Sequence, residues 1–332
     1  MKSPQIIKFK DRLIAPPTIR PEFGGRFAKM ECFKGIELGS GKVLEIAGTR
    51  HIVNHGFDNL ITDLGMDYKG DGSSNWNREC QIGTGTVAEV VGDTALGARE
   101  RAADSINDSW TTTQATAPYY GEQVMVFRFN PPGTNKVYSE VGISPFGIDT
   151  DNLNSRALIK DGVGAPDTIS VLADEWLDVT YELRLYPDHL TVGNDTVDGY
   201  DLDLLAHLVT FSTPNGWGSS VASAAATLFG STYSGDATLG PITGSPSSSG
   251  QDSNNAGGFA DTYNDGTFNR NLHFTWGLNE GNYTGASPGI GAVALRTTLG
   301  LYQVLFDPPI PKTLNDTLQI DLNVAWARSV IP

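Results

Sequence analysis

The sequence predicts an all-β protein: an antiparallel β-sandwich of jelly-roll type with an extended N-terminal arm and a long, loop-rich insertion. The 332 residues are 39% hydrophobic and only 18% charged, and 38 of them are glycine, so turn-forming residues take the place of charge. Several short segments alternate apolar and polar residues with a period of two, which indicates half-buried strands. No strand–helix–strand alternation is visible, which argues against a parallel sheet.

The clearest strand lies in the second half of residues 167–187. One face of it is apolar at every other position: Leu177, Val179, Tyr181, Leu183 and Leu185. The turn formers Pro131, Pro132 and Gly133 separate two further strand-like segments, 122–130 and 136–144, and predict a hairpin between them. The other expected strands are 207–212, 271–278, 298–306 and 317–327.

The chain divides by composition into three parts. Residues 1–42 are expected to form a basic, Pro-rich arm, residues 43–212 with 291–332 the sandwich body, and residues 213–290 an exposed Gly/Ser/Asn-rich insertion with one short helix at 217–230. Residues 1–30 hold seven basic and two acidic side chains, although the whole chain has a net charge of −15. Such an arm can clasp an identical neighbour or remain a solvated tail. The residues expected to carry the clasp are Lys8, Lys10, Arg12, Arg20 and Arg26.

Composition and net charge also limit the kinds of partner that the protein can bind. The acidic net charge argues against broad binding of nucleic acid. No apolar run approaches the ~20 residues that cross a bilayer, and no signal-peptide pattern is visible, so we expect no membrane insertion. Cys32 and Cys80 lack a C-x-x-C or other metal-ligand spacing, and reduced thiols are expected.

A glycine-rich stretch, CQIGTGTVAEVVGDTALGARE (80–100), raises the question of a nucleotide. Gly83, Gly85 and Ala88 fit the G-x-G-x-x-A spacing of a dinucleotide-binding turn. That turn needs a buried strand before it and a helix after it, but the lead-in is polar and Gly92 interrupts the following segment. We therefore predict a loop, and no cofactor is expected.

An acidic turn is a weak candidate for a calcium site. Asp-rich glycine turns supply the oxygen ligands that calcium needs, but the EF-hand order is missing here, and solvated turns are the favoured alternative. The candidate ligands are Asp195, Asp198, Asp201 and Asp203.

Catalytic patterns are weaker still. His51 and His55 are four residues apart, which would suit a metal only on a helix, and their surroundings look like a strand. Asp174 and Glu175 beside Trp176 could belong to a glycosidase, but among 38 acidic residues such neighbours arise by chance. We predict that the protein is not an enzyme.

Short motifs in a fixed order resemble those of tailed-bacteriophage virion structural proteins. They are NLITDLGMD (59–67), CQIGTGTVAEVVGDTALG (80–97), SEVGIS (139–144), SRALIKD (155–161) and ISVLADEWLDVTYELRLYP (169–187). The resemblance covers residues 45–190 and implies that the GTGT loop is structural. It also implies a non-enzymatic β-sandwich protein repeated by symmetry, commonly in the tail, its tip or its fibres.

We therefore expect a structural tail, tail-tip or fibre protein, assembled in the host cytoplasm into a virion and bound to other virion proteins and to its own copies, with a trimer the favoured state. Two alternatives stay open. One is a capsid decoration or head–neck protein. The other is a receptor-binding protein that recognises a host-surface glycan through exposed aromatic residues of the insertion, namely Tyr233, Phe259 and Tyr263.

Overall fold

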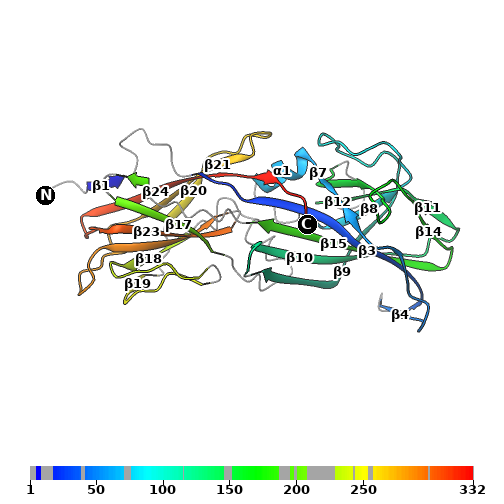
Figure 1. Ribbon diagram of the computed structural model, residues 1–332, viewed down its shortest axis with the longest axis horizontal. Helices are drawn as coiled ribbons and strands as arrows, with labels where there is room; N and C mark the ends of the chain where they lie inside the picture. The colour runs from blue at the N-terminus through cyan, green and yellow to red at the C-terminus, as the bar shows by residue number, and fades with distance from the viewer. Residues whose placement is uncertain are drawn as a thin grey trace.

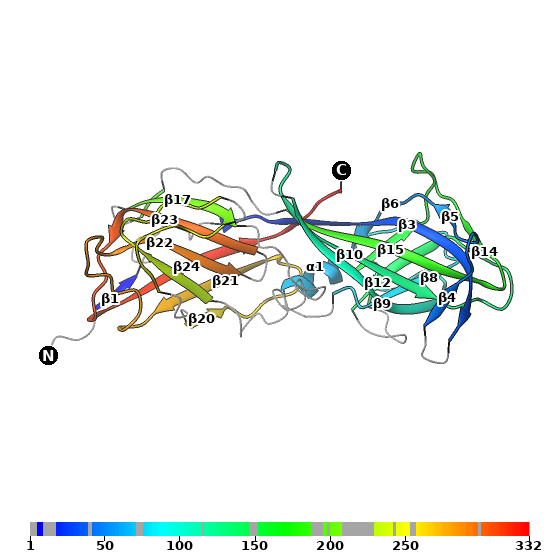
Figure 2. The same cartoon turned by 90° about the horizontal axis from the view of Figure 1, so that it is seen from below.

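The computed structural model describes residues 5–8, 18–38, 42–70, 76–114, 116–145, 152–186, 195–197, 200–207, 229–241, 244–252, 257–297 and 300–331. These residues are mostly β-strand, in large antiparallel sheets with one short helix, as the all-β prediction requires. Figures 1 and 2 show an elongated molecule in which two groups of strands lie end to end along the long axis. Within the described ranges, no helix is long and apolar enough to span a membrane.

The first group is a 12-stranded sheet in which β3 (Glu22–Glu37) and β15 (Glu175–Tyr186) pair along most of their length. Its order is β25-β3-β15-β10-β9-β8-β12-β13-β7, and β4, β5 and β6 add to β3. The bounds of these other strands are β4 Val43–Glu45, β5 His51–Asn54, β6 Phe57–Asp58, β7 Leu60–Ile61, β8 Glu79–Gly83, β9 Arg99–Gln114, β10 Tyr120–Phe129, β12 Glu140–Ser144, β13 Ser155–Leu158 and β25 Ala327–Arg328. A separate pair, β11 (Lys136–Tyr138) and β14 (Ile169–Val171), lies at the far end of this group (Figure 1).

The second group holds two sheets, one in the order β16-β17-β23-β22-β18-β19 and one in the order β1-β24-β21-β20, with β2 also on β24. Their bounds are β1 Gln5–Lys8, β2 Thr18–Ile19, β16 Asp195–Val197, β17 Tyr200–His207, β18 Phe229–Ser234, β19 Gln251–Asp252, β20 Gly257–Ala260, β21 Asn269–Trp276, β22 Ile290–Thr297, β23 Gly300–Ile310 and β24 Asp316–Ala325. Fully buried side chains such as Trp276 and Tyr302 fill its core.

Segments far apart in the sequence run together along the molecule. Strands β1 and β2 pair in parallel with β24, and β25, which directly follows β24, pairs in parallel with β3. The two chain segments that pass from one group toward the other, β2–β3 and β24–β25, therefore lie next to each other (Figure 2).

Helix α1 (Asp63–Gly70) joins the two groups. The indole nitrogen of Trp326 donates to the carbonyl of Met66 at 3.1 Å, and the Tyr263 hydroxyl donates to the Asp67 carboxylate at 2.7 Å. Arg270 adds a hydrogen bond to the Gly70 carbonyl at 2.9 Å. Both polar and aromatic contacts thus hold the helix of the first group against the end of the second.

The division of the chain differs from the one expected from composition. Residues 22–37 do not belong to an arm, because they form β3 between β15 and β25, with Phe23 and Phe27 fully buried. Arg26 lies within β3, with its Nε 3.3 Å from a carboxylate oxygen of Glu182. Arg20 is exposed just before β3, Lys8 ends β1, and Lys10 and Arg12 lie outside the described residues.

The expected insertion is also strand-rich where it is described. Strands β18 to β21 come from residues 229–276 and share their sheets with β22, β23 and β24. The helix expected at 217–230 falls outside the described residues up to 228, and β18 begins at Phe229. The expected 122–130/136–144 hairpin is wrong, because β10 pairs with β9 and β15, whereas β11 pairs with β14.

We predict that Gly70→Ala weakens the junction between the two groups. A Cβ at residue 70 would lie 2.5 Å from Tyr263 and 2.6 Å from Trp326, and overpacking of this kind costs about 1–3 kcal/mol. Helix propensity alone would favour alanine, so a loss isolates the steric effect. Denaturant unfolding followed by tryptophan fluorescence measures it, with Gly92→Ala as control because a Cβ there has no neighbour within 4 Å. Equal stability of the two variants would contradict this packing.

Candidate functional site

The glycine-rich loop after β8 wraps around a carboxylate from within the same chain. Glu140 in β12 is fully buried, and one of its oxygens accepts the amides of Gly85 at 2.8 Å and Ala98 at 2.7 Å. The other oxygen accepts the amide of Gly97 at 2.9 Å. Converging backbone N–H groups in glycine loops are a common anion-binding arrangement, and here the anion is the side chain of Glu140.

A buried arginine completes this carboxylate site. Arg156 in β13 is 3% exposed and donates to Glu140 at 2.9 Å through Nη2 and to Asp93 at 2.7 Å through Nη1. The same Nη2 donates to the carbonyl of Val87. The carboxylate therefore links β12, β13 and both ends of the loop between β8 and β9.

The glycines of the loop are needed for this close approach. A Cβ at Gly83 would lie 2.7 Å from a Glu140 oxygen, and a Cβ at Gly85 would lie 2.4 Å from one. The loop expected from the sequence is present, and the position that a phosphate would need against these amides is filled by the carboxylate. The arrangement can hold the loop rigidly.

A second notable feature is the hairpin formed by the end of β3 and β4, termed here the 34–46 hairpin, whose residues 39–41 lie outside the described part. Ile36 and Leu44 face each other across the two strands and are 56% and 58% exposed. Leu38 and Ile46 are also exposed and share their face by strand alternation. Figure 1 shows β4 projecting from the end of the first group.

The sequence analysis did not single out this hairpin, although a signal was present. The segment IELGSGKVLEI (36–46) has apolar residues at positions 36, 38, 44 and 46 on either side of Gly-Ser-Gly, which is a hairpin pattern. Its apolar face remains solvent-exposed in the folded chain, and exposed apolar faces of this kind mark interaction surfaces.

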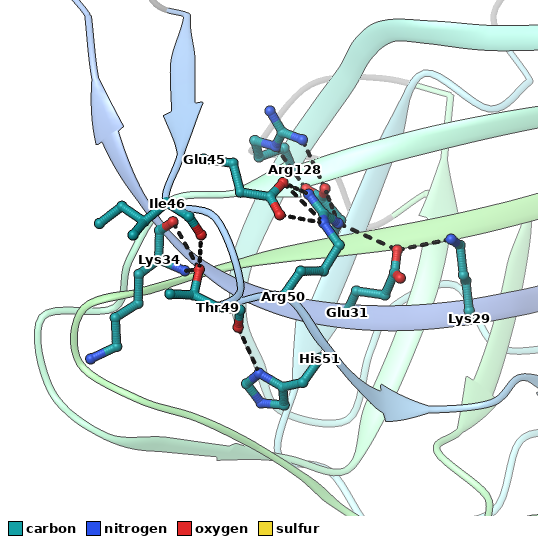
Figure 3. Close-up of polar contacts among 10 residues, drawn as sticks. Lys29, Glu31, Lys34, Glu45, Ile46, Thr49, Arg50, His51 and Arg128 are labelled. Atoms are coloured by element: carbon teal, nitrogen blue, oxygen red, sulfur yellow. Dashed lines mark hydrogen bonds and ion pairs between the residues drawn. The ribbon is translucent and has the colours of Figure 1, made fainter.

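The base of the 34–46 hairpin rests on an arginine cluster (Figure 3). Arg50 binds Glu45 at 2.6 Å and Asp178 at 3.1 Å, and Arg128 binds the same Asp178 at 2.7 Å. The guanidinium groups lie 4.3 Å and 4.9 Å from the ring centre of buried Phe33. Hydrogen bonds from Arg50 lower the pKa of the Glu45 carboxyl below its ordinary value. The hairpin is thereby fixed to the body at its polar face.

The three aromatic residues proposed for glycan recognition do not form one surface. Tyr233 in β18 is 3% exposed, and Tyr263 packs against Trp326 with ring centres 5.5 Å apart while it binds Asp67. Phe259 in β20 is 55% exposed and stacks on His273 at 4.5 Å. The structure thus leaves Phe259 accessible and places Tyr233 in the core.

The acidic turn at residues 195–203 lies in the hairpin of β16 and β17. Asp195 pairs in register with Leu202, while Asp201 and Asp203 belong to β17. Asp198 lies outside the described residues. The calcium hypothesis therefore stays a prediction from the sequence.

Both cysteines are free and buried. Glu175 and Trp176, considered for a glycosidase, are buried at the start of β15.

Comparison of the chain with protein-family models, with curated proteins and with solved structures finds no match.

We predict that Glu140→Gln destabilises the protein by about 3 kcal/mol, because removing one partner of a buried ion pair leaves Arg156 undercompensated. Glu100→Gln is the matched control, since Glu100 pairs with Lys136 at 2.7 Å on the surface, where the loss is below ~1 kcal/mol. Chemical denaturation of both variants measures the difference. Equal losses would show that the Glu140 carboxylate does not organise the loop.

Proposed function

We propose that the protein is a structural component of a tailed-bacteriophage virion, belonging to the tail, tail tip or fibre apparatus and assembled from symmetric copies. The observation that carries the proposal is that the residues on which the sequence resemblance rests meet at one place. Gly85 and Asp93 of the 80–97 motif, Glu140 of SEVGIS and Arg156 of SRALIKD form a single network. Motifs that converge on one buried framework support a shared architecture.

The finer architecture is part of this proposal. Strand β9 pairs with β8 through its first residues and with β10 through its last, so that the long sheet can fold back on itself. Core side chains come from both halves, for example Phe127 in β10 and Ile143 in β12. These features support a β-sandwich of jelly-roll type for residues 22–186.

The 34–46 hairpin suits assembly with further copies of the same chain. Its exposed apolar face, formed by Ile36, Leu38, Leu44 and Ile46, is a surface that another copy can cover. Strand β4 is also an edge strand, and such edges readily add a strand from a partner. We propose that this hairpin, and not a basic arm reaching to residue 42, makes the main contact between subunits, with a trimer the expected state.

The glycan-binding alternative loses two of its three residues, since Tyr233 is buried and Tyr263 is held by Asp67 and by packing against Trp326. The capsid decoration or head–neck alternative shares all the features above and is separated from the tail only by location. No chemistry is assigned, and the proposal is for a non-enzymatic protein.

We predict that Leu44→Lys weakens self-association at least about tenfold, which corresponds to ~1.4 kcal/mol, because it buries a charge in an apolar contact. Val163→Lys is the control, since Val163 is 89% exposed and lies outside the hairpin. Sedimentation equilibrium over a range of concentrations measures the oligomer, and circular dichroism checks the fold. A wild-type monomer at all concentrations, or unchanged association of Leu44→Lys, would rule out the hairpin contact.

The position in the particle is tested by gold-antibody labelling of intact virions, viewed by negative-stain electron microscopy. We expect label at the tail end or its fibres. Label over the head or neck would replace the tail assignment with the capsid alternative. Purified virions that lack the protein by both labelling and immunoblot would overturn the virion proposal itself.

A further inference from the structure

Three side chains with metal-binding atoms meet at the base of the 34–46 hairpin. Cys32 in β3 pairs on one side with His51 in β5 and on the other with Leu177 in β15. Glu175 precedes Leu177 by two residues and therefore shares its face of the sheet. One ligand atom from each of Cys32, His51 and Glu175 lies within 4.8 Å of the other two.

The imidazole of His51 is oriented for a ligand. Its Nδ1 lies 3.2 Å from the carbonyl oxygen of Thr49, which can only accept a hydrogen bond, so Nδ1 carries the hydrogen in the neutral ring. The lone pair is then on Nε2, which lies 3.9 Å from an oxygen of Glu175. Histidines that bind metals commonly donate their other N–H to a backbone carbonyl in this way.

The carboxylate of Glu175 is held in a similar manner. One of its oxygens accepts the amide of Leu172 at 2.9 Å, and the other is the oxygen near His51. Glu175 and Cys32 are buried, whereas His51 is exposed, so that an ion can enter from solvent on the His51 side.

The nearby cations have carboxylate partners of their own. Lys34 pairs in register with Glu175 and shares its face of the sheet, and its Nζ binds Asp174 at 2.7 Å. By strand alternation Arg50 lies on the face opposite to His51, and Figure 3 shows the two side chains pointing apart. Arg50 and Arg128 bind Asp178 on that opposite face.

We propose that Cys32, His51 and Glu175 bind a zinc ion through one sulfur, one nitrogen and one oxygen atom, with the fourth position open to solvent beside His51. Zinc accepts this mixed ligand set in tetrahedral geometry, and the thiolate and carboxylate balance its charge. On binding, the thiol proton leaves to solvent and the sulfur bonds to the metal. The ion ties β5 and the start of β15 to β3 directly below the apolar face of the hairpin. This site does not depend on the virion proposal.

The test uses the full chain, freed of metal with a chelator and then titrated with Co²⁺ and with Zn²⁺. A near-ultraviolet thiolate-to-cobalt band reports binding through cysteine, and competition by Zn²⁺ gives the zinc affinity. We compare wild type with His51→Ala, whose exposed position keeps folding intact, and with His55→Ala as the matched control, because His55 is another exposed histidine of the same segment. Cys32→Ser is the second variant.

We expect the band and zinc binding in wild type and His55→Ala. Changes to residues that only support metal ligands cost roughly 10–100-fold in metal affinity, so His51→Ala should lose at least this much zinc affinity. Cys32→Ser should lose the cobalt band. Absence of the band in wild type, or equal zinc affinity of His51→Ala and His55→Ala, would overturn the proposal. If Cys32→Ser does not fold, the two histidine variants still decide the question.

Discussion

The buried carboxylate of Glu140 is the interaction on which the first strand group depends. A buried charge is costly unless it is fully compensated, and here three backbone amides and Arg156 provide the compensation. That requirement dictates glycine at positions where a Cβ would collide with the carboxylate, and it fixes the loop that connects β8 to β9. The glycine spacing that resembles a nucleotide-binding turn is thus explained by an anion that the protein supplies itself.

The sequence predicted strands best where only one face is apolar. Strand β15 follows the expected alternation, and Leu177 to Leu185 on its apolar face are all buried. Strand β3 was assigned to the basic, Pro-rich arm because charged residues interrupt its apolar ones. Two of these charges have partners from other segments, Glu182 of β15 for Arg26 and Arg50 for Glu31. A sequence pattern cannot reveal such partners, since they come from distant segments.

The candidate sites were predictable to different degrees for the same reason. The alternation around the Gly-Ser-Gly turn was sufficient to predict the 34–46 hairpin, and only its exposure required the structure. The three residues at the proposed zinc site come from three strands and have no spacing that a motif could capture. His51 was weighed with His55 as its sequence neighbour, but strand register places Cys32 opposite it instead. Likewise, Tyr233 was expected to be solvent-exposed because glycine and serine residues surround it in the sequence, yet β18 lies within a sheet, between β22 and β19.

The parallel pairing of β25 with β3 has a consequence for how the chain reaches its native state. During synthesis, β3 leaves the ribosome long before residues 327–328, so the edge that β25 covers stays open while the second group is being made. Helix α1 likewise lacks its hydrogen bond from Trp326 until that residue has been synthesised. Pairings between such distant segments form slowly, and an open edge can meet the same edge on another nascent chain. Because the fold is completed only by its last strand, the yield of folded protein should fall as the concentration of nascent chains rises.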